Sequence, residues 1–275
     1  MTATLTAPRT SDGSALSTVG VIRSEWIKLR TVRSTVWSYA IIVAVSLGLA
    51  LLLSSVSDFG TNAVPEDQQN VILLQASTFG IYFGQLIVAV LGVLVISGEY
   101  STGMIRSTLT AVPKRIPALA AKALVLFIAT FVIGLISTFG AFLVASPILA
   151  SHGIEADLSD GKLFADLVLA SLYLALTAVF SLGLGTVLRS SAGGIAAALG
   201  TILLLPTILQ LIASFTQAQW AVDLMPYLFS NAGTGMFMES LDPAGFEQWQ
   251  NTLVVVVWTA VSLAAGALLL KRRDA

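Results

Sequence analysis

Six long apolar segments constrain the fold of this 275-residue chain more than any other feature of its sequence. A helix that crosses the hydrocarbon core of a bilayer needs about 20 mostly apolar residues, because each residue adds about 1.5 Å across roughly 30 Å. Such a helix also satisfies its own backbone hydrogen bonds, which lipid cannot do. We therefore predict an all-α integral membrane protein with six spans, at Thr35–Val56, Leu74–Ser97, Ala118–Ser146, Ala165–Leu188, Gly193–Phe215 and Thr252–Leu270.

The composition agrees with a membrane protein and excludes several kinds of chemistry. Charged residues make up only 11% of the chain, whereas soluble domains carry about 25%. The chain has no cysteine and a single histidine, His152, so it has neither a thiol nucleophile nor a histidine cluster for a metal. We expect Lys122, near the start of the third span, to be the charged residue inside the spans, with its ammonium group snorkelling to the surface.

The distribution of charge predicts the orientation. If the six spans alternate in direction, every lysine and arginine except Lys162 falls on one side. By the positive-inside rule that side is cytoplasmic, so both ends of the chain are expected in the cytoplasm. Residues 1–17 are expected to be a disordered tail, and the first span a retained anchor. The opposite loops are acidic, with Asp58, Glu66, Asp67, Glu155, Asp157, Asp160, Asp223, Glu239, Asp242 and Glu247.

Residues 18–34 predict an amphipathic elbow helix before the first span. Val19, Ile22, Trp26 and Leu29 recur at helical spacing among basic residues, as in a helix that lies in the membrane interface. Such a helix either serves only as a positive-inside anchor or bends sharply into the first span and also contacts a cytoplasmic partner. Its candidate functional residues are Arg23, Trp26, Lys28, Arg30 and Arg33.

Within the transmembrane domain, residues 35–275, the loop at 98–117 predicts a short docking helix. Ile105, Leu109 and Val112 share one helical face beside basic residues, which suits docking into a groove on another protein. Glu99 lies where the second span leaves the bilayer, and an unpaired carboxylate there is costly. It is either paired with Arg106 or with a basic residue of the elbow helix, as a hinge that transmits motion, or it simply reaches water.

Two further regions depart from plain spans. Residues 216–251 form an external loop too long for a simple connector, and its amphiphilic stretches predict short helices that dip back from the outer surface; an ordered external cap is the alternative. Pro206 predicts a kink in the fifth span. Small residues in the fourth and fifth spans predict close helix contacts, at Gly183, Gly185, Gly193, Gly194, Ala198 and Gly200.

The elbow Ile22-Arg-Ser-Glu-Trp-Ile-Lys-Leu-Arg30, the six spans and the loop motif Glu99-Tyr100-x-x-Gly103-x-Ile105-Arg106 together resemble the permease subunits of bacterial ABC-2 type exporters, especially small actinobacterial ones. The resemblance covers nearly the whole chain after Ser17 and implies an ABCG-like six-helix permease. It also implies that the loop after the second span is a coupling helix that rests on an ATPase. Many relatives have threonine where this chain has Met104. The residues implied at this interface are Glu99, Tyr100, Gly103, Met104, Ile105, Arg106 and Leu109.

The sequence carries no energy source of its own. It has no Gly-x-x-x-x-Gly-Lys-Ser/Thr phosphate loop, and its spans are expected to lack the buried Asp, Glu and His with which proton-coupled carriers usually relay charge. The leading hypothesis is the permease of an ATP-driven exporter in a bacterial plasma membrane, acting as a dimer with two ATPase subunits. ATP and Mg²⁺ would bind only the ATPase, and the cargo would be a drug, peptide antibiotic or lipid. No nucleic acid is expected as a partner. The alternatives are an intramembrane enzyme and a structural or sensory membrane subunit.

Overall fold

The computed structural model describes residues 18–56, 65–104, 115–154, 158, 161–238 and 245–272, and these residues contain helices and no strand. The expected tail at 1–17 lies outside them. The helices of the described residues are α1 (Thr18–Thr31), α2 (Arg33–Val56), α3 (Glu66–Ser101), α5 (Arg115–Ala150), α6 (Gly161–Leu188), α7 (Ser191–Leu199), the π-helix η1 (Gly200–Leu204), α8 (Leu205–Thr216), α9 (Gln219–Leu224), the 3₁₀-helix η2 (Met225–Tyr227), α10 (Phe229–Gly235) and α11 (Gln248–Arg272).

Six segments of the described chain are long and apolar enough to span a membrane, as predicted, and they run as α2, α3, α5, α6, α7 to α8, and α11. Several of these helices extend beyond the predicted bounds. The third, for example, covers Arg115–Ala150 rather than Ala118–Ser146 and includes Pro147 in its last turn. The chain is therefore an all-α, multi-pass membrane protein.

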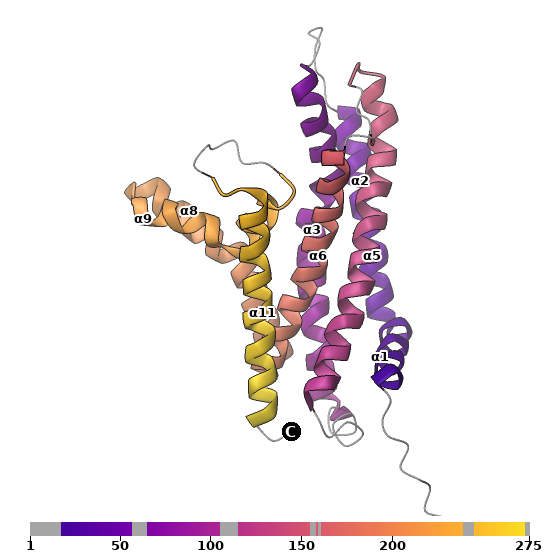
Figure 1. Cartoon of the computed structure of the whole chain (residues 1–275), viewed down its shortest axis with the longest axis vertical. Coiled ribbons are helices and arrows are strands. Elements are labelled where there is room, and N and C mark those ends of the chain that lie inside the picture. Colours follow the sequence, from indigo (N-terminus) through magenta and orange to yellow (C-terminus); the bar gives the residue numbers. More distant parts are fainter. Residues whose placement is uncertain are drawn as a thin grey trace, which may run out of the picture.

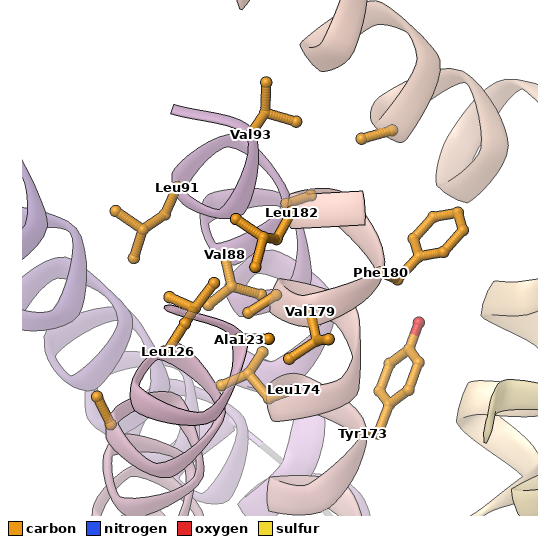
Figure 2. Packing of buried hydrophobic residues seen from close by; sticks show 14 of the residues in the cluster. Val88, Leu91, Val93, Ala123, Leu126, Tyr173, Leu174, Val179, Phe180 and Leu182 are labelled. Atoms are coloured by element: carbon orange, nitrogen blue, oxygen red, sulfur yellow. The ribbon is translucent and has the colours of Figure 1, made fainter. Parts of the chain in front are cut away.

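The centre of the bundle is α6. Of its most apolar window, 78% is buried inside the protein, and it packs against α3, α5 and α11 (Figure 1). Figure 2 shows that α6 uses both of its sides. Leu174 and Val179 lie toward α3 and α5, whereas Tyr173 and Phe180 point the other way. A helix in this position contacts most of the bundle, so its side chains join the two halves of the core.

Two predictions about charge inside the spans are wrong. Lys122 does not snorkel, since it is only 5% exposed and its ammonium group lies inside the protein. The expectation also overlooked Asp166 near the start of α6, which is equally buried. Asp166 accepts a hydrogen bond of 2.6 Å from Gln248 Nε2 at the start of α11. Both charges are tolerated because they have partners within the bundle.

The fifth span is helical throughout and changes direction near Pro206, where a kink is predicted. Proline has no backbone N–H, so it cannot close the helical hydrogen bond with the residue four positions earlier. The chain widens into the π-helix Gly200–Leu204 directly before α8, and Pro206 lies in the first turn of α8. Figure 1 shows α8 leaning away from the other helices, with α9 beyond it. Only 17% of this span's apolar window is buried within the chain.

The segment after α8 folds into short helices, and the last of them, α10, packs deep in the bundle. Phe229 is fully buried. Its ring stacks on Phe180 of α6 with centroids 4.4 Å apart. Gly233 lies against the ring of Tyr173, so a Cβ there would collide with it. The predicted short helices are present, and α10 closes over the face of α6 that α3 and α5 leave free.

The predicted small-residue contacts are confirmed at some positions and wrong at others. Gly183 meets α11 at Ser262, and Gly185 meets α3 at Val93 and Ile96. Gly194 likewise lies against Val93. In contrast, a Cβ added to Gly200 would have no neighbouring atom within 4 Å. Gly200 opens the π-helix instead of forming a close contact.

Candidate functional site

The most unusual polar feature of the described chain is a closed ring of four charged side chains from three helices, here called the charge ring. Glu25 and Lys28 come from α1, Glu99 from the end of α3, and Lys122 from near the start of α5. Lys28 Nζ donates to Glu25 Oε1 at 2.7 Å and to Glu99 Oε1 at 3.0 Å. Lys122 Nζ donates to Glu25 Oε2 at 2.6 Å and to Glu99 Oε1 at 2.9 Å. Two positive and two negative charges make the ring formally neutral.

The ring exists because α1 presents a mixed face to the bundle. Glu25 and Leu29 are the buried residues of α1, four positions apart on one side of the helix, with Lys28 partly buried beside them. Val32 is not helical, and α2 starts at Arg33, so the chain turns sharply between α1 and the first span. This turn sets α1 at the foot of α5, at the same end of the bundle as the end of α11 (Figure 1).

The energetic cost of losing one charge from the ring depends on how deeply its four side chains are buried. Glu25 and Glu99 are 4% exposed and Lys122 is 5% exposed, whereas the side chain of Lys28 is 31% exposed. Removing ions from water is costly, and each ion here recovers that cost only through its partners. Losing one member would therefore leave a buried charge with reduced compensation.

The ring also fixes the protonation of its α1 members. Burial alone would raise the pKa of Glu25, but the ion pairs with Lys122 and Lys28 outweigh burial and hold that pKa below its ordinary value of 4.5. Burial alone would lower the pKa of Lys28, but its hydrogen bonds to Glu25 and Glu99 outweigh burial and raise that pKa above 10.5. Both groups are charged at neutral pH.

The motif that follows Glu99 ends α3 and begins the next connection. Tyr100 stacks under the guanidinium of Arg189, which lies 5.3 Å from the ring centroid. Gly103 has a φ of +72°, a left-handed conformation that favours glycine and stops the helix. Met104 is 44% exposed. The remaining residues of the predicted interface, Ile105, Arg106 and Leu109, lie outside the described residues.

Other basic residues gather at the same end of the bundle. Arg115, the first residue of α5, donates from Nη1 to the backbone carbonyl of Leu270 at 2.9 Å, near the end of α11. Arg189, after α6, lies over Tyr100 at the end of α3. We call this the basic end. Arg115 and Arg189 lie at the same end, as the sequence predicts, so the alternation of spans agrees with the fold at these described residues.

A cavity of about 360 Å³ adjoins the charge ring. It lies between α1, α2, α3 and α5, and all four ring residues line it. Most of its remaining wall is apolar, including Leu29, Leu91, Leu94, Val95 and Val125. The cavity is therefore lined by the four charged residues of the ring and otherwise mostly by apolar side chains.

Sequence reasoning found two members of the ring as candidate site residues and missed two. Glu99 pairs with Lys28, a basic residue of the expected elbow helix, so the alternative of a carboxylate that merely reaches water is wrong. Glu25 was not predicted, although its position four residues before Leu29 on the buried face was a usable signal. The other candidates of the elbow helix are exposed and take no part in the ring, namely Arg23, Trp26, Arg30 and Arg33.

Among the residues that the structure describes, no group of three or more histidine, cysteine, aspartate or glutamate side chains could hold a metal ion. The charge ring consists of two carboxylates and two ammonium groups that pair with one another. Of its four interactions, one joins α1 to the end of α3, one joins α1 to α5, one joins α3 to α5, and one lies within α1.

Comparison with known families agrees with this architecture. The family profile described as ABC-2 family transporter protein matches residues 21–199, from within α1 to the end of α7. The matched region is more than half of the chain and contains the whole charge ring. The chain therefore belongs to the ABC-2 transporter family, and it is a membrane permease rather than an enzyme. Membership implies association with an ABC ATPase. No curated protein matches the chain.

Proposed function

We propose that this chain is the membrane-spanning permease subunit of an ATP-driven exporter that moves a hydrophobic or amphipathic molecule outward. The observation that carries the proposal is the family match over residues 21–199. The absence of a phosphate-loop sequence supports a separate ATPase as the site of ATP and Mg²⁺ binding. Two permease and two ATPase subunits form the working complex, in the plasma membrane of a bacterium.

The basic end faces the cytoplasm in this proposal, by the positive-inside rule. The predicted loop at 98–117 overlaps both helices, since α3 ends at Ser101, two residues after Glu99, and α5 starts at Arg115, seven residues before Lys122. Both ends of the loop are thus tied to α1 through the charge ring. A push on this loop would reach α1, α3 and α5 together, so the ring is suited to transmit force from the ATPase to the spans.

The apolar character of the chain favours a hydrophobic cargo. The six described spans have mean hydropathies between 2.2 and 2.5, and their polar residues are mostly paired inside the bundle. Such a surface offers little to stabilise a small hydrated ion. It suits a drug-like molecule, a peptide antibiotic or a lipid.

Purification of the tagged chain from its native membrane tests the proposal. We expect an ATP-hydrolysing subunit with a phosphate loop to copurify, and the reconstituted complex to hydrolyse ATP faster than the ATPase alone. If no such subunit copurifies and transport is insensitive to ATP, the proposal is wrong. A structural or sensory subunit would copurify but would show no ATP-dependent transport.

The role of the loop is tested by Glu99→Ala and Arg106→Ala. We expect both variants to insert into the membrane normally but to lose the stimulation of ATP hydrolysis by the permease. The matched control is Leu143→Ala, because Leu143 is 68% exposed on α5 and lies away from the charge ring. Unchanged stimulation in both loop variants would reject the assignment.

A further inference from the structure

The charge ring contains one acceptor that nothing in the described structure uses. Glu25 employs both of its carboxylate oxygens, and Glu99 employs Oε1. Glu99 Oε2 is buried and accepts no hydrogen bond. A buried carboxylate oxygen without a donor loses its hydration and gains nothing in return. Glu99 lines the cavity, but Oε2 itself is buried, so a donor in the cavity reaches this oxygen only if the carboxylate turns toward it.

The same cavity also contains a positively charged hydrogen-bond donor, Lys28. The ammonium group of Lys28 has three N–H bonds, and two of them point to Glu25 and Glu99. Its side chain is 31% exposed and lines the cavity. An anionic group can therefore approach Lys28 without breaking the ring, while a donor approaches Glu99.

The remaining wall and the opening of the cavity are apolar. Leu94 lines the cavity and is 38% exposed, and Val32 also lines it and is 47% exposed. These side chains lie on the outer surface of the bundle, where a membrane protein meets lipid. The volume of about 360 Å³ falls within the range of roughly 300–1,000 Å³ for small-molecule sites.

We propose that the cavity binds the headgroup and upper chain of a phospholipid that carries a phosphate and an ammonium with N–H bonds, as phosphatidylethanolamine does. The ammonium donates to Glu99 Oε2, and the phosphate accepts from Lys28. Hydrocarbon of the same lipid covers Leu94 and Val95. Because this headgroup is a zwitterion, the site stays formally neutral when it is filled, which a simple cation would not allow.

The depth of the site fits a headgroup. Glu99 is two residues from the end of α3, and Lys28 belongs to α1, which precedes the first span. Polar headgroup regions add several ångströms on each side of the hydrocarbon core. A lipid at this position would hold α1, α2 and α3 together beside the ring, and its loss would loosen the elbow.

Lipid competition tests the proposal with the unmodified chain. The protein is placed in nanodiscs with equal amounts of phosphatidylethanolamine and phosphatidylcholine of matched chains, and retained lipids are counted by native mass spectrometry. We expect about tenfold enrichment of phosphatidylethanolamine, the factor that one hydrogen bond to a charged group supplies. Equal retention would mean that water alone serves Glu99 Oε2, and it would overturn the proposal.

Stepwise methylation of the amine separates hydrogen bonding from size. The mono- and dimethylated lipids keep at least one N–H, so retention should stay high and fall only at the trimethylated choline. A smooth decline with each methyl group would indicate exclusion by size and overturn the assignment. Displacement of the lipid by equimolar free phosphoethanolamine would assign the site to a soluble molecule and overturn it as well.

A cavity-filling variant locates the site. Leu94→Trp should block the apolar entrance without touching the charge ring and reduce the tenfold enrichment to near equality. Leu143→Trp is the matched control, since it adds the same ring on an exposed part of α5 and should leave the enrichment unchanged. If the enrichment survives Leu94→Trp, the lipid binds elsewhere and the proposal is wrong.

Discussion

Two short helices that are not spans, α1 and α10, are fixed to the bundle by opposite means. Two ion pairs of the charge ring attach α1 to its neighbours, Lys28 with Glu99 of α3 and Glu25 with Lys122 of α5. In contrast, α10 is held by the stack of Phe229 on Phe180 and by Gly233 against Tyr173. Both helices bury side chains in the bundle, but only one of them depends on charge.

The two kinds of attachment differ in the changes that would weaken them. Buried ions are stable only while their charges balance, so a single added or lost charge weakens the attachment of α1. Close apolar packing is not weakened by the gain or loss of one proton or ion, because dispersion and burial do not depend on charge. The attachment of α1 therefore depends on charge balance, whereas that of α10 depends on packing.

The largest expected effect comes from removing one ion of the ring. Lys122→Met keeps the length and apolar stem of the side chain but leaves two buried carboxylates with only Lys28. Breaking a buried pair in this way costs about 3 kcal/mol or more. We expect that loss in the free energy of unfolding measured in mixed micelles, together with release of α1.

A second substitution separates charge imbalance from lost packing. In Lys122→Met with Glu25→Gln the ring is neutral again, because Lys28 and Glu99 still balance each other. This double variant should recover most of the lost stability. If it is no more stable than Lys122→Met alone, charge balance does not hold α1, and the contrast with α10 fails.

Titration should weaken the docking of α1 by a smaller amount. The pKa of Glu25 is lowered from 4.5, so its contribution is present above pH 4.5 and is lost as the pH falls through the lowered value. The pKa of Lys28 is raised from 10.5, so its contribution is present below pH 10.5 and is lost as the pH rises through the raised value. The docking should therefore be constant across neutral pH.

Spin labels can follow this titration on both helices, because the chain has no cysteine of its own. Ser24→Cys on α1 and Asn231→Cys on α10 both place the label at an exposed position. The label on α1 should gain mobility only in strong acid or strong base, whereas the label on α10 should not respond. Equal responses from the two labels would show that pH acts on the whole bundle.

Features that depend on hydrophobicity along the chain can be predicted from the sequence. Contacts between residues that are distant in sequence are predicted less well. The six spans and the kink near Pro206 follow from local composition and from the missing N–H of proline. The charge ring joins Glu25, Glu99 and Lys122, which are far apart in sequence, and no local rule pairs them. A lysine near a span end ordinarily snorkels, but at Lys122 two buried carboxylates override that rule.

The position of α10 shows the same limit for apolar packing contacts. The stretch around Phe229 predicts a short helix, but only the structure reveals that α6 turns Tyr173 and Phe180 toward it (Figure 2). Likewise, nothing in the sequence distinguishes Gly233, which touches a ring, from Gly48, which has no atom within 4 Å of an added Cβ. Contacts of this kind depend on the packing of helices that are distant in sequence.

Gly233→Ala should have a moderate effect that depends on packing alone. The added methyl group collides with Tyr173, which is 2% exposed and hydrogen-bonded to Gln85, so the ring has little freedom to move. Overpacking of this kind costs about 1–3 kcal/mol. The loss should appear in the free energy of unfolding and should not vary between about pH 6 and pH 9, because dispersion and burial do not titrate.

The control for this prediction is Gly48→Ala in α2. An alanine there meets no neighbour, and alanine favours a helix over glycine by roughly 0.5–1 kcal/mol. The control should be neutral or stabilising. If both variants lose the same stability, the contact between Gly233 and Tyr173 is not what fixes α10.

The smallest effect should come from the polar contact near α10. Trp258 of α11 donates from Nε1 to the backbone carbonyl of Tyr227 at 2.9 Å, just before α10. Trp258→Phe removes this hydrogen bond but keeps an aromatic ring near Phe180, so it should cost only about 0.5–1.5 kcal/mol. Because packing rather than polar contact holds α10, a spin label at Asn231→Cys should stay immobile in this variant. A mobile label would mean that the hydrogen bond fixes the segment, and α10 would then resemble α1 in depending on polar partners.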